Sequence, residues 1–138
     1  MGRKNVHDLV AEARAEIEEL SVEQVQAELD AGTAMLVDIR DFRERIENGA
    51  IPGSVSAPRG MLEFWFDEES PYHQDRYTPE GRYIFCCASG WRSALATKAI
   101  QELGFTNVAH LEPGFSGWVE AGNDVEDVAS TSKWIKRP

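Results

Sequence analysis

The sequence lacks a long apolar run and is poor in cationic side chains. Its 138 residues contain no apolar stretch long enough to span a bilayer, and no basic N-terminal region followed by a hydrophobic segment. We therefore expect a cytoplasmic protein with no membrane partner.

Lys and Arg number 14 against 24 Asp and Glu, for a net charge of -10. An acidic surface of this size repels phosphate backbones, so we expect no nucleic-acid partner.

Patterns that bind metals or form disulfides are also missing. The only two cysteines, Cys86 and Cys87, are adjacent. Neighbouring side chains on a strand point to opposite faces, so a disulfide between the two would be strained. The three histidines, His7, His73 and His110, have no ligand spacing to each other or to the cysteines. We expect no structural disulfide and no metal site.

Helical and strand patterns alternate along the chain. Apolar residues recur at helical spacing over residues 6–20, which predicts an amphipathic N-terminal helix. Nearly continuous apolar runs predict strands that are buried on both faces. The predicted strands cover 34–39, 51–57, 82–87 and 108–111, and the predicted helices cover 6–20, 22–32, 41–47, 61–66, 93–103 and 115–121. This alternation predicts a single α/β domain with a parallel sheet flanked by helices and an extra N-terminal helix.

The most informative segment is residues 87–93, between a predicted strand and a predicted helix. Parallel sheets bind ligands at the carboxyl ends of their strands, and a helix N-terminus there favours an anion such as a thiolate. Residues 88–90 are small, so backbone amides can curl around an anion, and Arg92 adds a positive charge. The pattern favours Cys87 as a nucleophile, with a structural cysteine in an ordinary turn as the alternative. Cys86, within the strand, is interpreted as a core residue.

Three motifs occur in order along the chain. The spacing of Cys87, Gly90, Arg92 and Ser93 resembles the active-site loop of the rhodanese-like sulfurtransferases. The other two motifs lie upstream and downstream of this loop. They comprise Asp38, Arg40, Glu44, Gly49 and residues 51–53 upstream, and residues 113–115 with Trp118 downstream. The resemblance covers roughly residues 22–122, and we divide the chain into an N-terminal amphipathic helix at 1–20, a rhodanese-like domain at 21–122 and a C-terminal tail at 123–138.

The resemblance implies a role for each matching residue. Cys87 matches the nucleophile, and Ala88, Ser89, Gly90, Trp91, Arg92 and Ser93 match the loop that binds the substrate. Asp38 and Arg40 match positions that support the structure. Arg59 lies in a region that borders the pocket in similar proteins, so we interpret it as a candidate anion contact, with an exposed surface position as the alternative.

The implied activity is that of a thiosulfate sulfurtransferase. Cys87 would take a sulfane sulfur from a small anionic donor such as thiosulfate, hold it as a persulfide, and pass it to cyanide or a thiol, including a thiol on a protein. No cofactor is implied.

Two other functions remain open at this point. A cysteine phosphatase or arsenate reductase also uses a cysteine in an amide-lined loop closed by Arg. Such enzymes need a longer loop than the four residues between Cys87 and Arg92. The other alternative is a catalytically idle rhodanese-like module that binds a partner or senses redox state.

Overall fold

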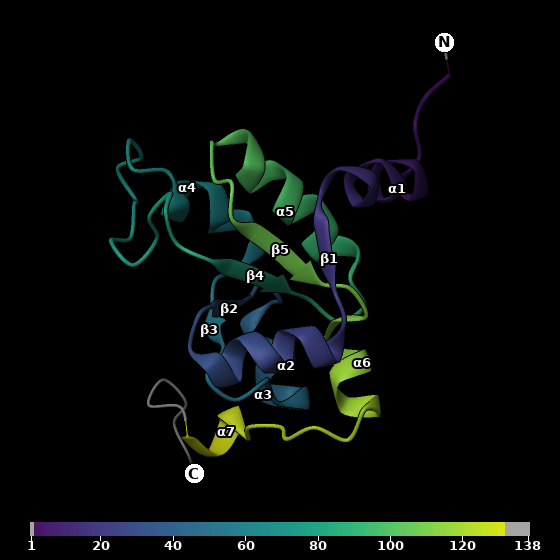
Figure 1. Cartoon of the computed structure of the whole chain (residues 1–138), viewed down its shortest axis with the longest axis vertical. Coiled ribbons are helices and arrows are strands. Elements are labelled where there is room, and N and C mark those ends of the chain that lie inside the picture. Colours follow the sequence, from purple (N-terminus) through teal and green to yellow (C-terminus); the bar gives the residue numbers. More distant parts are fainter. Residues whose placement is uncertain (1, 132–138) are drawn as a thin grey trace.

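A five-stranded parallel sheet forms the centre of the fold in the computed structural model, which describes residues 2–131 (Figure 1). The strand order is β1-β5-β4-β2-β3, and every pairing between neighbours is parallel. The strands are β1 (Glu18–Leu20), β2 (Met35–Asp38), β3 (Val55–Ser56), β4 (Tyr83–Cys86) and β5 (Val108–Leu111). The predicted α/β class with a parallel sheet is confirmed.

Helices cover both faces of this sheet. They are α1 (Val6–Glu16), α2 (Val22–Ala31), α3 (Phe42–Asn48), the short 3-10 helix η1 (Arg59–Met61), α4 (Leu62–Phe66), α5 (Trp91–Glu102), α6 (Gly114–Glu120) and α7 (Val128–Thr131). Side chains of α4 and α5 pack on one face, and those of α2 and α6 pack on the other. Helix α1 lies on the outer side of α5.

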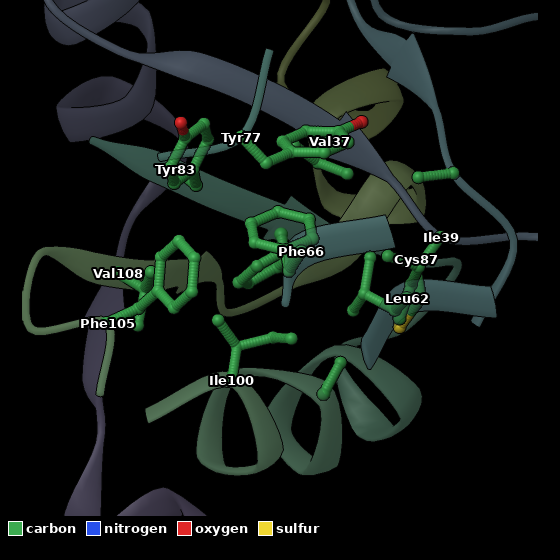
Figure 2. Close-up of a cluster of buried hydrophobic side chains, with 13 residues drawn as sticks. Val37, Ile39, Leu62, Phe66, Tyr77, Tyr83, Cys87, Ile100, Phe105 and Val108 are labelled. Carbon is green, nitrogen blue, oxygen red and sulfur yellow. The ribbon is translucent and has the colours of Figure 1, made fainter. Parts of the chain in front are cut away.

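The alternation of side chains along β4 explains the two cores. Tyr83 and Phe85 point toward α4 and α5, whereas Ile84 and Cys86 point toward α2 and α6. Figure 2 shows Phe66 of α4 at the centre of the first core, with the Tyr77 ring stacked on it at a centroid distance of 4.0 Å. Cys87 lies at one end of this cluster, beside Ile39 and Leu62 (Figure 2).

The N-terminal segment differs from its prediction. Asn5 caps α1 in a capping box, as a helix start requires, but the helix ends at Glu16 because Ile17 adopts an extended conformation. Residues 18–20 form β1, the edge strand that pairs with β5. The prediction of helix through residue 20 was therefore wrong, because three residues are too few for a strand pattern to be recognised.

The predicted C-terminal tail is partly ordered. An antiparallel bridge joins Ala50 to Glu126, and the Trp118 indole N–H donates to the Asp124 carbonyl at 2.8 Å. Helix α7 then packs beside α3 (Figure 1). Residues 132–138 of the predicted tail lie outside the described residues. Within residues 2–131, no helix has the length and apolar character needed to cross a membrane.

Candidate active site

The Cys87 sulfur lies in a cradle of backbone amides at the start of α5. It follows directly on β4, at the carboxyl end of the parallel sheet. The backbone N–H groups of Gly90 and Ser93 donate to Sγ over 3.2 and 3.3 Å, and the thiol donates to the Ser93 hydroxyl over 3.4 Å. A sulfur bearing negative charge would therefore meet two N–H donors and the positive end of a 12-residue helix.

The backbone around the cradle requires glycine at two places. Gly90 adopts a φ of +90°, which places the chain at the start of α5, and a Cβ there would collide with the Glu112 carbonyl. Gly114, with a φ of +68°, begins α6, and a Cβ there would lie 2.5 Å from the Ala88 carbonyl oxygen. The first turn of α6 is thus in direct contact with the loop.

Cys86 lies in different surroundings from its neighbour. Its side chain packs with Leu36, Ile84 and other residues on the α2 and α6 face, and its thiol donates to the Cys87 carbonyl over 3.4 Å. Burial, with a further contribution from the Asp38 carboxylate, raises the pKa of the Cys86 thiol well above its usual range. Cys86 therefore stays a neutral core thiol.

A buried ion cluster supports the strand next to the loop. The Asp38 carboxylate accepts from the Arg40 guanidinium, with a shortest distance of 2.8 Å, and from Arg45 at 2.9 Å. Arg40 also donates to the Gly49 carbonyl at 2.8 Å, and its guanidinium lies 4.3 Å from the centroid of the Phe115 ring. These contacts of Asp38 and Arg40 join β2, α3 and α6.

The two arginines proposed as anion contacts are paired with carboxylates. Arg92 donates to both oxygens of Glu44 on α3, at 2.8 and 3.0 Å, and this pair lowers the pKa of the Glu44 carboxyl. Arg59 donates to Glu63 one helical turn later, at 2.7 Å. Neither guanidinium is hydrogen-bonded to the Cys87 sulfur.

The rest of the loop faces outward. Trp91 is 42% exposed, and its ring meets the edge of His7 from α1 at a centroid distance of 4.9 Å. Ser89 is exposed. Ala88 lines an open cavity of about 670 Å³ between α3 and α6, whose walls include the acidic Glu44 and the apolar Phe115.

Sequence reasoning missed two residues that the fold brings next to the loop. His110 is fully buried, and its Nδ1 lies 2.8 Å from the Ser93 hydroxyl while its Nε2 lies 2.9 Å from a Glu19 carboxylate oxygen. Burial lowers the pKa of His110, and the bond to Glu19 opposes this shift only in part. The sequence feature that could have identified His110 was the presence of a single histidine inside the predicted buried strand 108–111.

The part of the chain that the structure describes contains no cluster of metal-ligating side chains. Over residues 2–131, no three His, Cys, Asp or Glu side chains come together in an arrangement that could hold a metal ion. The chemistry available at this site is that of a cysteine sulfur and its hydrogen-bond donors.

Comparison with known proteins identifies relatives of this arrangement. The mouse thiosulfate sulfurtransferase/rhodanese-like domain-containing protein 3 is 30% identical over 101 residues, which are 70% of this chain and 64% of that protein. The chain thus spans less than two thirds of the length of this relative.

Two solved structures are similar over nearly their whole length. A Rhodopseudomonas palustris protein of unknown function, described as a possible tyrosine phosphatase, superposes with a TM-score of 0.86 at 41% identity, covering 91% of this chain and 97% of its own. The human single-domain sulfurtransferase TSTD1 gives a TM-score of 0.64 at 29% identity, covering 74% and 95%. The family model described as rhodanese-like domain matches residues 21–121, and the chain therefore belongs to the rhodanese-like domain family.

Proposed function

We propose that this chain is a sulfurtransferase that carries a sulfane sulfur on Cys87 as a persulfide. The observation that carries the proposal is the position of the Cys87 sulfur, which accepts N–H bonds from Gly90 and Ser93 at the start of α5. Membership of a family whose relatives include named sulfurtransferases supports a role in sulfur transfer in general. Beyond sulfur transfer in general, we propose that thiosulfate is the donor and that a persulfide is the intermediate.

The proposed reaction has two displacement steps. In the first, the Cys87 thiolate attacks the outer sulfur of thiosulfate, a new S–S bond forms, and the bond to the sulfonate sulfur breaks to release sulfite. In the second, cyanide or a thiolate attacks the terminal sulfur of the persulfide. The S–S bond to Cys87 breaks, its electron pair returns to the Cys87 sulfur, and thiocyanate or a new persulfide leaves.

The amides of the loop from Ala88 to Ser93 serve both steps. In the empty site, the N–H groups of Gly90 and Ser93 stabilise the thiolate, and in the loaded site they are available to the anionic terminal sulfur. Such donors are fixed in place before reaction, so they need no rearrangement as charge moves from one sulfur to the next. Ser89 and Trp91 form the outward side of this loop, which is where we place the approach of a small or protein-borne thiol acceptor.

Arg92 and Arg59 provide the positive charge that attracts the donor in this proposal. Each is held by one carboxylate, Glu44 or Glu63, and a guanidinium has five N–H donors, so each retains donors for a sulfonate group. The remaining acidic surface makes such local positive charge necessary for an anionic donor to approach.

Phosphatase activity is the second candidate because the Rhodopseudomonas palustris relative is described as a possible tyrosine phosphatase. The short loop argues against it, since only four residues separate Cys87 from Arg92. We therefore expect no hydrolysis of an aryl phosphate under conditions in which thiosulfate is consumed.

The decisive experiment compares the two neighbouring cysteines. Thiocyanate formation from thiosulfate and cyanide is measured for the natural chain, for Cys87→Ser and for the matched control Cys86→Ser. We expect Cys87→Ser to abolish turnover and Cys86→Ser to retain it.

Mass measurement tests the intermediate directly. After incubation with thiosulfate and removal of the excess, the intact chain should gain the mass of one sulfur atom, located on Cys87 and removed by cyanide. A well-folded chain that gains no sulfur and shows no turnover would instead be the idle binding or redox-sensing module.

A further inference from the structure

A continuous line of hydrogen bonds leads from the Cys87 sulfur to the edge strand of the sheet. The thiol donates to the Ser93 hydroxyl over 3.4 Å, and that hydroxyl lies 2.8 Å from His110 Nδ1 on β5. His110 Nε2 lies 2.9 Å from Glu19 Oε2 on β1, where the two residues are direct partners in the parallel pairing. Three elements, β1 from the start of the chain and the consecutive α5 and β5, therefore converge on one line behind the Cys87 sulfur.

The chemistry of the partners fixes the direction of each bond. A carboxylate only accepts, so the proton that His110 shares with Glu19 belongs to Nε2. Burial lowers the pKa of His110, which favours the neutral ring at pH 7, and its Nδ1 is then an acceptor for the Ser93 hydroxyl. The Ser93 oxygen in turn accepts from the thiol. Each group thus donates to the next one outward, the arrangement that a proton transfer away from sulfur requires.

We propose that Ser93 and His110 form a proton relay that converts the Cys87 thiol to the reactive thiolate, with Glu19 as the positioning residue that orients and stabilises the His110 ring. This inference deepens the proposed sulfurtransferase function and rests on it for its biological use. Burial of both Cys87 and His110 makes the relay useful, because a fully buried sulfur has no direct access to solvent for losing its proton.

The transfer balances without any added reactant. The S–H bond of Cys87 breaks and an O–H bond forms on Ser93, while the original Ser93 proton moves to His110 Nδ1. The products are a thiolate and an imidazolium, and the imidazolium is held by the Glu19 carboxylate. The bond between Cys87 and Ser93 and the bond between Ser93 and His110 then reverse, whereas His110 Nε2 still donates to Glu19. The Ser93 hydroxyl thereby joins the Gly90 and Ser93 amides as a third donor to the negative sulfur.

The charged groups around His110 supply a matched control. These groups are Glu19 from β1, Arg14 from α1 and Glu112 after β5. Arg14 bridges both carboxylates, at 3.1 Å to Glu19 and 3.0 Å to Glu112, but only Glu19 is bonded to His110. Glu19→Gln and Glu112→Gln therefore each remove one carboxylate charge that pairs with Arg14. They differ because only Glu19 is in contact with the His110 ring.

The test is a titration of the Cys87 thiolate, followed by its ultraviolet absorbance in the natural chain and both variants. Cys86 does not interfere near neutral pH, because burial keeps its pKa high. We expect Glu19→Gln to move the midpoint of the titration upward by about one pH unit, since the imidazolium loses its counter-charge. Turnover with thiosulfate at pH 7 should fall about tenfold in kcat, with little change in KM. Glu112→Gln leaves the bond between Glu19 and His110 intact, so it should change both measurements much less than Glu19→Gln.

Equal titration midpoints in the natural chain and Glu19→Gln would overturn the relay, and so would equal shifts in both variants, which would indicate a general field effect. Ser93→Ala provides a second test, because it cuts the line. In that background Glu19→Gln should shift the midpoint no further. The titration needs no sulfur transfer, so a chain that fails to take sulfur from thiosulfate would refute the proposed function and still leave the relay tested.

Discussion

The guanidinium of Arg92, from the loop that is proposed to take an anion, is held by the Glu44 carboxylate. Its side chain is 43% exposed, so the pair with Glu44 is screened by water and contributes little to stability. The same exposure leaves the guanidinium free to change partner when an anionic donor arrives. In the proposed reaction, Glu44 would therefore compete with the donor for Arg92.

Substitutions on the two sides of this pair should have opposite effects. Arg92→Ala should raise the KM for thiosulfate by about three- to tenfold, because one charge-assisted contact is lost. Glu44→Gln should lower the KM, because Arg92 is released while the loop backbone is unchanged. Steady-state kinetics at constant ionic strength measure both values. If neither substitution changes the KM, Arg92 serves only to join α5 to α3.

His110 makes stability depend on pH. Burial lowers its pKa below the ordinary value of 6.5, so below pH 6.5 the unfolded chain binds a proton that the folded chain takes up only at lower pH. The stabilisation that comes from a neutral His110 is therefore fully present above pH 6.5. It is lost as the pH falls from 6.5 toward the lower pKa of His110 in the folded chain. We expect the free energy of unfolding in urea to fall between pH 7.5 and pH 5.5, and to fall less steeply in His110→Gln. Parallel pH dependence in the two proteins would contradict this assignment.

At the scale of elements, the site depends on two loops that lie back to back. The loop after β4 holds the sulfur, and the turn after β5 supports it from behind. The Phe115 N–H donates to the Cys87 carbonyl at 2.8 Å, and the Ser116 N–H donates to the Ala88 carbonyl at 3.0 Å. The start of α6 thereby fixes the carbonyls of the cradle while α5 supplies its amides.

Substitutions at two glycines with positive φ can distinguish an effect on the cysteine loop from the general cost of backbone strain. Gly114→Ala and Gly104→Ala both place a side chain at positive φ, at a cost of about 1–2 kcal/mol each. A Cβ at Gly104 meets open space, whereas a Cβ at Gly114 would lie 2.5 Å from the Ala88 carbonyl oxygen and 2.7 Å from the Ser89 nitrogen. The loop must then shift. Urea unfolding should show the larger loss for Gly114→Ala, and turnover should fall about tenfold or more in that variant only.

The buried strands and the cysteine loop could be predicted from the sequence because their signals are local. Apolar runs at 34–39 and 82–87 predicted β2 and β4, and the small residues after Cys87 predicted the amide cradle. The contact between Ser93, His110 and Glu19 joins three elements, and only the pairing of β1 with β5 brings it about. The pairing of Arg92 with Glu44 is likewise a long-range contact, so residue type alone suggested a role in anion binding but not its partner.

At the scale of the whole molecule, the first twenty residues are joined to the domain in two ways. Strand β1 extends the sheet, and α1 covers α5 with Val10 and Ala13, which pack against Ala94. Val6 and Leu9, near the start of α1, are exposed. The junction is therefore small, but it involves α5, the helix whose first turn donates an N–H bond to the Cys87 sulfur. We infer that residues 6–20 unfold together with the sheet rather than as a separate appendage.

The pair Ala13→Asp and Ala11→Asp tests this inference with one substitution at two positions of one helix. Ala13 is fully buried against α5, whereas Ala11 is exposed. A carboxylate at position 13 would lose water without a designed partner, which should cost about 2–4 kcal/mol, while the change at position 11 should cost less than about 1 kcal/mol. If the N-terminal segment and the domain form one cooperative unit, Ala13→Asp lowers the urea midpoint of the whole circular dichroism transition. Hydrogen exchange then rises in β4 as well as in α1, because every global opening exposes both. Faster exchange confined to α1, with an unchanged midpoint, would show instead that the segment is an independent addition to residues 21–122.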